Sequence, residues 1–166
     1  MMAESRDQKK PAVHLREITS NNLRMVLALG VSEEQEQVYP RSNAYSIAEG
    51  HYPRDNDPVW MRAIYADEVP VGFIMTSEAP ENGEYFLWRL MIDQDHQGNG
   101  YGSAAVGLLV ARIQASGNAR FLVTDHLEGD GNAGSFYARH GFRYTGEVLS
   151  EGELVMRRDF NGGDAR

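Results

Sequence analysis

The chain has 166 residues, of which 42% are hydrophobic and 24% are charged, values typical of a soluble protein with one domain and a sizeable core. It contains no cysteine and has a formal net charge of −8, which excludes disulfides, thiolate metal sites and a cysteine nucleophile, and argues against a nucleic-acid partner. No apolar run approaches the length of a membrane span, and the N-terminus lacks the apolar core of a secretory signal, so we expect a cytoplasmic protein with no membrane partner.

The first third of the chain predicts one strand and several short helices. We expect a single domain at residues 12–160, with flexible tails at residues 1–11 and 161–166. Alternating apolar and polar residues in Val13–Ile18 predict a half-buried strand, and the helix that follows ends at Gly30. Two further short helices, separated by a proline, are expected around Glu33–Val38 and Asn43–Gly50.

Strands dominate the rest of the chain. Val59–Asp67 and Val69–Glu78 flank a very short turn, which predicts a hairpin. The elements predicted after it are a strand at Glu84–Asp93, a helix at Gly100–Ser116, a strand at Arg120–Asp125, a helix at Asn132–His140 and two strands within Phe142–Phe160. One strand–helix–strand crossover in an otherwise antiparallel order predicts an α+β fold, with a mixed, mostly antiparallel sheet of about seven strands and helices on both faces.

The segment "MIDQDHQGNGYGSAAVGLLV" places Gly98, Gly100 and Gly102 between a strand and a long helix. The first amides of a helix lack internal acceptors, the helix dipole adds positive charge there, and glycines let the backbone approach a ligand. The turn therefore predicts an anion site, most often for phosphate, although a tight turn without a ligand is the simpler alternative. A P-loop is excluded because no lysine follows the glycines. A dinucleotide-binding turn with Asp125 as the ribose acid is disfavoured, because the roughly forty residues that remain cannot form a second mononucleotide-binding half.

Two motifs carry a resemblance to a known family. The stretch from Gln97 to Gly102, "QGNGYG", resembles the acyl-CoA pyrophosphate loop of the GCN5-related N-acetyltransferases (GNAT), Gln/Arg-x-x-Gly-x-Gly/Ala. Downstream, "SFYARHGF" resembles the family's Phe/Leu-Tyr-x-x-x-Gly-Phe, with Tyr137 in the tyrosine position. The resemblance covers nearly the whole chain and implies a GNAT-type sheet. The longer stretches "WRLMIDQDHQGNGYG" and "GFRYTGEVLSEGELVM" also resemble the spermidine and diamine acetyltransferase branch of the family.

The resemblance implies that acetyl-CoA is the acyl donor, with its pyrophosphate over the amides of the glycine turn. Gln97 would shape the loop or bind the phosphates, and the pantetheine arm would pair with the backbone of the preceding strand. No lysine lies in the turn, so backbone amides are expected to do most of the binding. The cofactor-binding residues expected on this basis are Leu90, Met91, Ile92, Gln97, Gly98, Asn99, Gly100, Tyr101, Gly102, Ser103 and, through a loop shift, Asn132. The five histidines have no metal-like spacing, and no metal is expected.

The absence of cysteine favours direct attack of an amine on the thioester. The family match makes Tyr137 the acid that protonates the leaving thiolate. Related polyamine enzymes carry an acidic residue on the strand before the loop, at the position where this chain has Trp88. The predicted general base is therefore Glu84, an acidic residue earlier on the same strand. Candidate substrate contacts are Glu34, on an acidic helix face, and the aromatic side chains of Tyr85 and Trp88. A structural or solvated role is the alternative for each of these side chains.

The predicted function is acetyl-CoA-dependent N-acetylation of a small primary amine, with polyamines or diamines favoured. The alternatives are acetylation of an amine-bearing antibiotic, or of protein N-termini or lysines. A non-catalytic CoA-binding module is the alternative of another class. The family resemblance also implies a homodimer.

Overall fold

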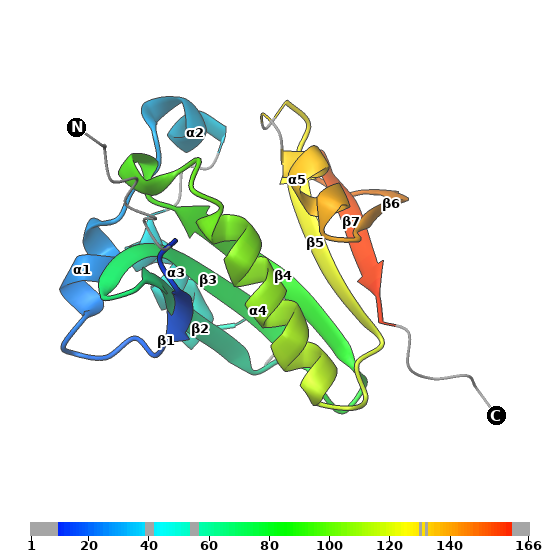
Figure 1. Ribbon diagram of the computed structural model, residues 1–166. Coiled ribbons are helices and arrows are strands. Elements are labelled where there is room, and N and C mark those ends of the chain that lie inside the picture. Colours follow the sequence, from blue (N-terminus) through cyan, green and yellow to red (C-terminus); the bar gives the residue numbers. More distant parts are fainter. Residues whose placement is uncertain (1–9, 39–41, 54–56, 130, 132, 161–166) are drawn as a thin grey trace, which may run out of the picture.

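A seven-stranded mixed sheet organises the protein. The computed structural model describes residues 10–38, 42–53, 57–129, 131 and 133–160. The strand order is β1-β2-β3-β4-β5-β7-β6, and every neighbouring pair is antiparallel except β4 and β5. The strands are β1 (Val13–Arg16), β2 (Val59–Ala66), β3 (Val69–Ala79), β4 (Glu84–Ile92), β5 (Phe121–Leu127), β6 (Arg143–Val148) and β7 (Glu153–Asp159). The predicted sheet with a single parallel crossover is confirmed (Figure 1).

Helices cover both faces of this sheet, also as predicted. They are α1 (Leu23–Ala28), α2 (Glu33–Val38), α3 (Asn43–His51), the 3-10 turn η1 (Gln94–His96), α4 (Tyr101–Ala115) and α5 (Ala133–Arg139). The long helix α4 crosses one face, and α1 and α3 lie against the other (Figure 1). None of the helices in the described residues is both long enough and apolar enough to cross a membrane.

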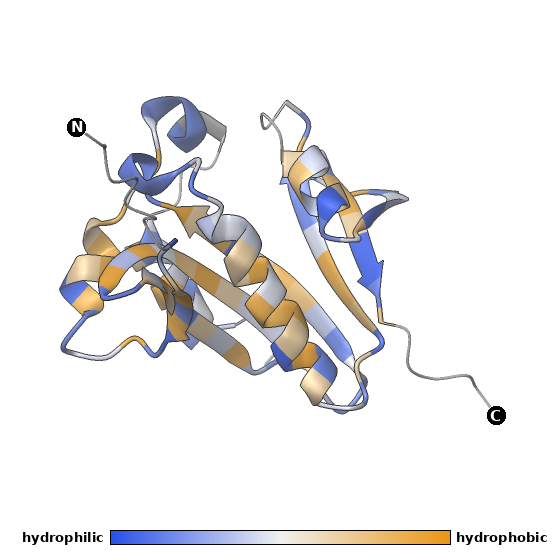
Figure 2. Cartoon of the chain, viewed as in Figure 1, coloured by the Kyte–Doolittle hydropathy of each residue, from blue (hydrophilic) through white to orange (hydrophobic). Residues whose placement is uncertain are grey.

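Two apolar cores lie between the sheet and the helices, one on each face. On the α4 side, Ala105, Leu109 and Ile113 repeat every four residues, so one stripe of the helix is buried against the sheet. On the opposite face, Val26 of α1 packs with Phe73 and other residues of the central strands. Hydrophobic colouring accordingly follows the central strands and α4 (Figure 2).

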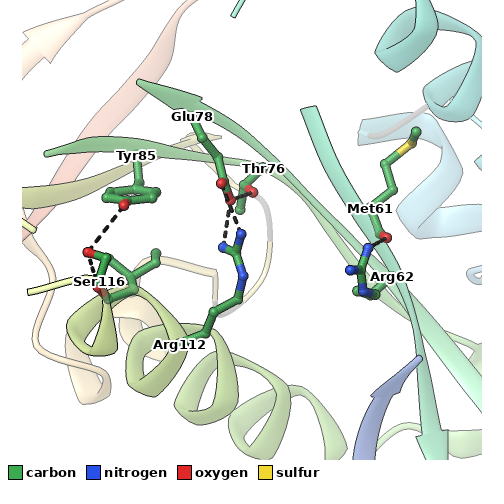
Figure 3. A network of polar contacts seen from close by, with 8 residues as sticks. Met61, Arg62, Thr76, Glu78, Tyr85, Arg112 and Ser116 are labelled. Atoms are coloured by element: carbon green, nitrogen blue, oxygen red, sulfur yellow. Dashed lines mark hydrogen bonds and ion pairs between the residues drawn. The ribbon is translucent and has the colours of Figure 1, made fainter. Parts of the chain in front are cut away.

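A polar clamp fixes α4 on the sheet. Arg112, near the end of α4, donates to both oxygens of the Glu78 carboxylate on β3 at 2.7 and 3.0 Å. Thr76 donates to the same carboxylate at 2.6 Å, and the Arg112 guanidinium lies 4.2 Å from the Trp60 ring centre. Glu78 is only 7% exposed, and its charge is therefore stabilised by these partners (Figure 3). The clamp holds the helix whose other end forms the glycine turn.

The parallel strands β4 and β5 diverge toward that turn. Their pairing is limited to Glu84–Phe86 opposite Phe121–Val123. At the point of divergence, Thr124 donates its hydroxyl proton to the carbonyl oxygen of Leu87 at 3.1 Å. From there to Ile92, the edge of β4 that faces β5 has no strand partner among the residues that the structure describes. An open strand edge of this kind can accept an extended, amide-containing ligand.

Candidate active site

The glycine turn has the geometry of an anion site. Gly98 and Gly100 have φ values of 77° and 79°, a region that other L-residues rarely adopt. Gly100 is the N-cap of α4 and offers no side-chain cap, and no acidic residue lies in the first turn of the helix. The first amides of α4 and the positive end of its dipole are therefore available to an external anion. Gly102 differs, because an added Cβ would make only ordinary 3.6 Å contacts with Ile92 and Phe136.

Two amide side chains shape this turn. The Gln97 side chain donates to the carbonyl oxygen of Ile92 and to the Gln35 side chain, both at 2.9 Å. Asn99 donates to the carbonyl oxygens of His96 and Gln97 at 2.9 and 3.2 Å. These bonds use the side-chain amide donors within the protein, so the two side chains hold the shape of the loop.

Neighbouring elements anchor the same loop. The Asp93 carboxylate accepts from the amides of Gly30 and Asp95 at 2.9 and 3.1 Å, and it thereby joins the end of β4 to the segment after α1. Sequence reasoning did not identify Asp93, although an acidic residue at the end of a strand and before a tight turn is a common capping signal.

Tyr137 lies on α5, whose end is tied to the start of α4. Its ring packs against Phe136 and Phe142, with centroid distances of 5.2 and 5.4 Å. One turn on, His140 shares a 3.1 Å hydrogen bond between its Nε2 and the Ser103 hydroxyl. Burial lowers the pKa of His140, and Arg139 and Arg158 lower it further. The lowered pKa favours the neutral imidazole, and its hydrogen bond to Ser103 connects the end of α5 to the first turn of α4.

A carboxylate lies just beyond the point where β4 and β5 diverge. Leu122, Thr124 and His126 are buried, and they alternate with less buried residues along β5. Since Leu122 belongs to the core under α4, alternation places the half-buried Asp125 on the opposite face. Asp125 therefore faces away from the helix that begins at the glycine turn.

Other charged groups surround Asp125 on this face. Burial raises the pKa of Asp125, and the charge of Glu153 raises it further, whereas Arg89 and His126 act in the other direction. Arg89, on β4, also donates to Glu49 of α3 at 3.1 Å. Sequence reasoning considered Asp125 only as a ribose-binding acid, because its position at the divergence depends on tertiary structure.

The structure separates two predicted residues from the glycine turn. Glu84 begins β4 and pairs with Arg120 at 3.2 Å, while the turn follows the other end of the strand, roughly 26 Å away at about 3.3 Å per residue. Tyr85 is 5% exposed, and its hydroxyl donates to Ser116 at 3.4 Å, at the far end of α4. Both side chains therefore have structural partners remote from the turn.

The other predicted residues are placed differently. Trp88 packs beside Met91 against the core on the α1 and α3 face. Glu34 lies exposed on α2, the helix that contacts the turn through the bond between Gln35 and Gln97. The predicted contact Asn132 lies outside the described residues.

A mixed sheet with one parallel pair and a glycine turn at the start of α4 are the features that the comparison with known proteins assigns to a family of acyltransferases. Residues 26–142 match the Acetyltransferase (GNAT) family. The chain is 27% identical over 154 residues to the spermine/spermidine N(1)-acetyltransferase of Bacillus subtilis (strain 168), covering 89% of this chain and 99% of that protein.

Solved structures share the fold. One is the PaiA N-acetyltransferase from Thermoplasma acidophilum in complex with coenzyme A, with a TM-score of 0.67, 16% identity, and coverage of 90% of this chain and 99% of that one. Another is a spermidine N-acetyltransferase SpeG chimera from Vibrio cholerae and hSSAT, with a TM-score of 0.68, 17% identity, and coverage of 89% and 94%. The chain belongs to the GNAT family and is an N-acetyltransferase similar to its spermidine acetyltransferase branch.

Proposed function

We propose that the enzyme transfers an acetyl group from acetyl-CoA to a small cationic amine, with polyamines or diamines as the favoured acceptors. The observation that carries the proposal is Asp125, a half-buried carboxyl at the divergence of β4 and β5, on the face opposite α4. The similarity to a spermine/spermidine acetyltransferase supports the choice of acceptor. The net charge of −8 is also compatible with a cationic substrate.

The donor site combines the turn with the open strand edge. Amides from Gly98 to Ser103 would hold the pyrophosphate at the N-terminus of α4. The backbone of Leu90–Ile92 would pair with the pantetheine arm, since this part of β4 has no partner on the β5 side among the described residues. Gln97 and Asn99 would act indirectly, by holding the loop through the hydrogen bonds described above.

Two side chains would carry out the proton transfers of the reaction. Bound acetyl-CoA supplies an activated thioester carbonyl, but an aliphatic ammonium must first lose a proton, because its pKa is about 10.4. Asp125 would accept this proton, directly or through water, and the amine nitrogen would then form a bond to the carbonyl carbon as the carbon–sulfur bond breaks. Tyr137 would donate a proton to the departing sulfur, and the second proton that the nitrogen loses as the amide forms would restore the tyrosine hydroxyl. The raised pKa of Asp125 makes its carboxylate a stronger base toward the ammonium group.

We assign the base to Asp125 in place of Glu84. Glu84 lies at the opposite end of β4 and pairs with Arg120, whereas Asp125 lies where the strands separate. Trp88, on the same face as Asp125, and Glu34, on α2 beside the turn, remain proposed acceptor contacts.

A release assay tests this proposal. Thiol release from acetyl-CoA would be followed with spermidine, spermine, short diamines, an aminoglycoside and peptides with free N-termini or lysines. The proposal expects the highest kcat/KM with a polyamine or diamine. A preference for the aminoglycoside or a peptide would redirect the substrate assignment, and CoA binding without thiol release would indicate a non-catalytic module. We further expect a homodimer, to be checked by light scattering.

A further inference from the structure

The segment before β1 brings a lysine to the glycine turn. The Ala12 amide donates to the Asp67 carboxylate at 2.9 Å, and its carbonyl oxygen accepts from the Asp67 amide at 2.8 Å. The backbone is therefore anchored two residues after Lys10. From there the Lys10 side chain reaches α4, and its Nζ lies 3.1 Å from the position that a Cβ would occupy on Gly100.

This is an unfavourable position for a cation unless an anion is also present. A helix N-terminus carries about half a positive charge, which repels an ammonium group. The protein supplies little compensation there, because the N-cap Gly100 has no side chain and no acidic residue lies in the first turn of α4. A negatively charged ligand between the ammonium and the helix amides would convert this repulsion into two attractive interactions.

The turn has space for such a ligand beside Lys10. A Cβ built on Gly98 would meet no atom within 4 Å, so the backbone there is open. A phosphate over these amides would lie next to the Lys10 ammonium, which is a compact charge suited to phosphate oxygens.

We propose that Lys10 binds the phosphates of the CoA donor and thereby makes residues 10–12 part of the donor site. This inference rests on the proposed use of acetyl-CoA. It assigns a phosphate-binding cation that the turn itself lacks, since neither lysine of the chain lies within it. The amides would fix the position of the pyrophosphate, and Lys10 would add a salt-dependent attraction.

Calorimetry on the full chain tests the proposal. Wild type, Lys10→Ala and Lys10→Arg would be titrated with CoA, dephospho-CoA and pantetheine over a range of sodium chloride concentrations. Arg24→Ala is the matched control, because Arg24 lies exposed on α1 and its removal changes the net charge equally. We expect Lys10→Ala to weaken CoA binding about three- to tenfold at low salt and to flatten its salt dependence. Lys10→Arg should retain most of the affinity, and pantetheine binding should not change.

The three ligands distinguish which phosphate Lys10 binds. A loss that persists with dephospho-CoA assigns Lys10 to the pyrophosphate, and a loss that disappears assigns it to the 3′-phosphate. The proposal is overturned if Lys10→Ala binds CoA with wild-type affinity and salt dependence, if Arg24→Ala has the same effect, or if pantetheine binding weakens equally. A wild-type protein that does not bind CoA would instead overturn the donor assignment, and the role of Lys10 with it.

Discussion

Replacing Asp125 by Asn should remove most of the catalytic activity while preserving the fold. The side chains have nearly the same size, but the amide cannot accept a proton from the ammonium of the acceptor. Loss of a positioned general base typically lowers the rate about 10²- to 10⁴-fold. We expect kcat to fall by this factor near neutral pH. The residual rate should increase with pH, as more of the amine becomes neutral.

The pH profile gives a more specific signature. In the wild type, kcat/KM should increase with pH as Asp125 loses its proton, and the raised pKa should place this increase above the range of an ordinary carboxyl. Glu153→Gln removes a charge that raises the pKa of Asp125, so the increase should move to lower pH. Asp125→Asn should abolish this part of the profile and leave only the increase at higher pH that comes from deprotonation of the amine.

The expected stability of Asp125→Asn follows from the same pKa shift. Because the pKa of Asp125 is raised in the folded protein, folding binds a proton at pH values between the unfolded and folded pKa. Stability therefore decreases as pH rises through that interval. Asp125→Asn cannot show this decrease, so its Tm at neutral pH should equal or exceed that of the wild type.

Glu84→Gln is the matched control for these measurements. It removes a carboxylate from the same sheet, but one that is paired with Arg120 and 41% exposed, so stability should change by less than about 1 kcal/mol and kcat should not change. Equal activity and an unchanged pH profile for Asp125→Asn, or a large loss for Glu84→Gln, would refute the assignment of the base.

Other variants test the remaining parts of the site. Tyr137→Phe should lower kcat about 10- to 100-fold with little change in CoA affinity, and an unchanged kcat across pH would exclude the tyrosine as the acid. Gly100→Ala should weaken CoA binding and lower stability by about 1–2 kcal/mol, because its φ is 79°; the control Gly107→Ala, exposed in the same helix and without a close neighbour, should raise stability by roughly 0.5–1 kcal/mol. Glu78→Gln should lower the free energy of unfolding by about 2–3 kcal/mol, because it breaks the clamp with Arg112; urea denaturation that shows no change would contradict this role.

Much of the fold was predictable because its signals are local. The alternation in β1, the short turn between β2 and β3, and the apolar stripe of α4 depend on residues that are close in sequence. The geometry of the glycine turn was also predictable, since the positive φ of Gly98 and Gly100 is what a glycine-rich turn requires. The boundaries were less accurate: α1 ends at Ala28 rather than at Gly30.

The groups proposed for catalysis and charge recognition were less predictable because their positions depend on the assembled sheet. Glu84 was predicted from its place on the strand before the loop, but β4 runs toward the turn, so its first residue is the one farthest from the turn. Asp125 and Arg89 are 36 residues apart in sequence and interact only because β4 and β5 are neighbours. The approach of Lys10 to Gly100 likewise depends on the pairing of β1 with β2.

The central claim is that amides at the start of α4 bind the diphosphate of an acyl-CoA and so present its thioester to an amine on the far side of the sheet. A crystal structure of the protein with CoA is the most direct measurement. We predict that the pyrophosphate contacts the amides of Gly98 to Ser103 and that the pantetheine arm lies between β4 and β5. CoA bound elsewhere, with the glycine turn empty, would contradict the account.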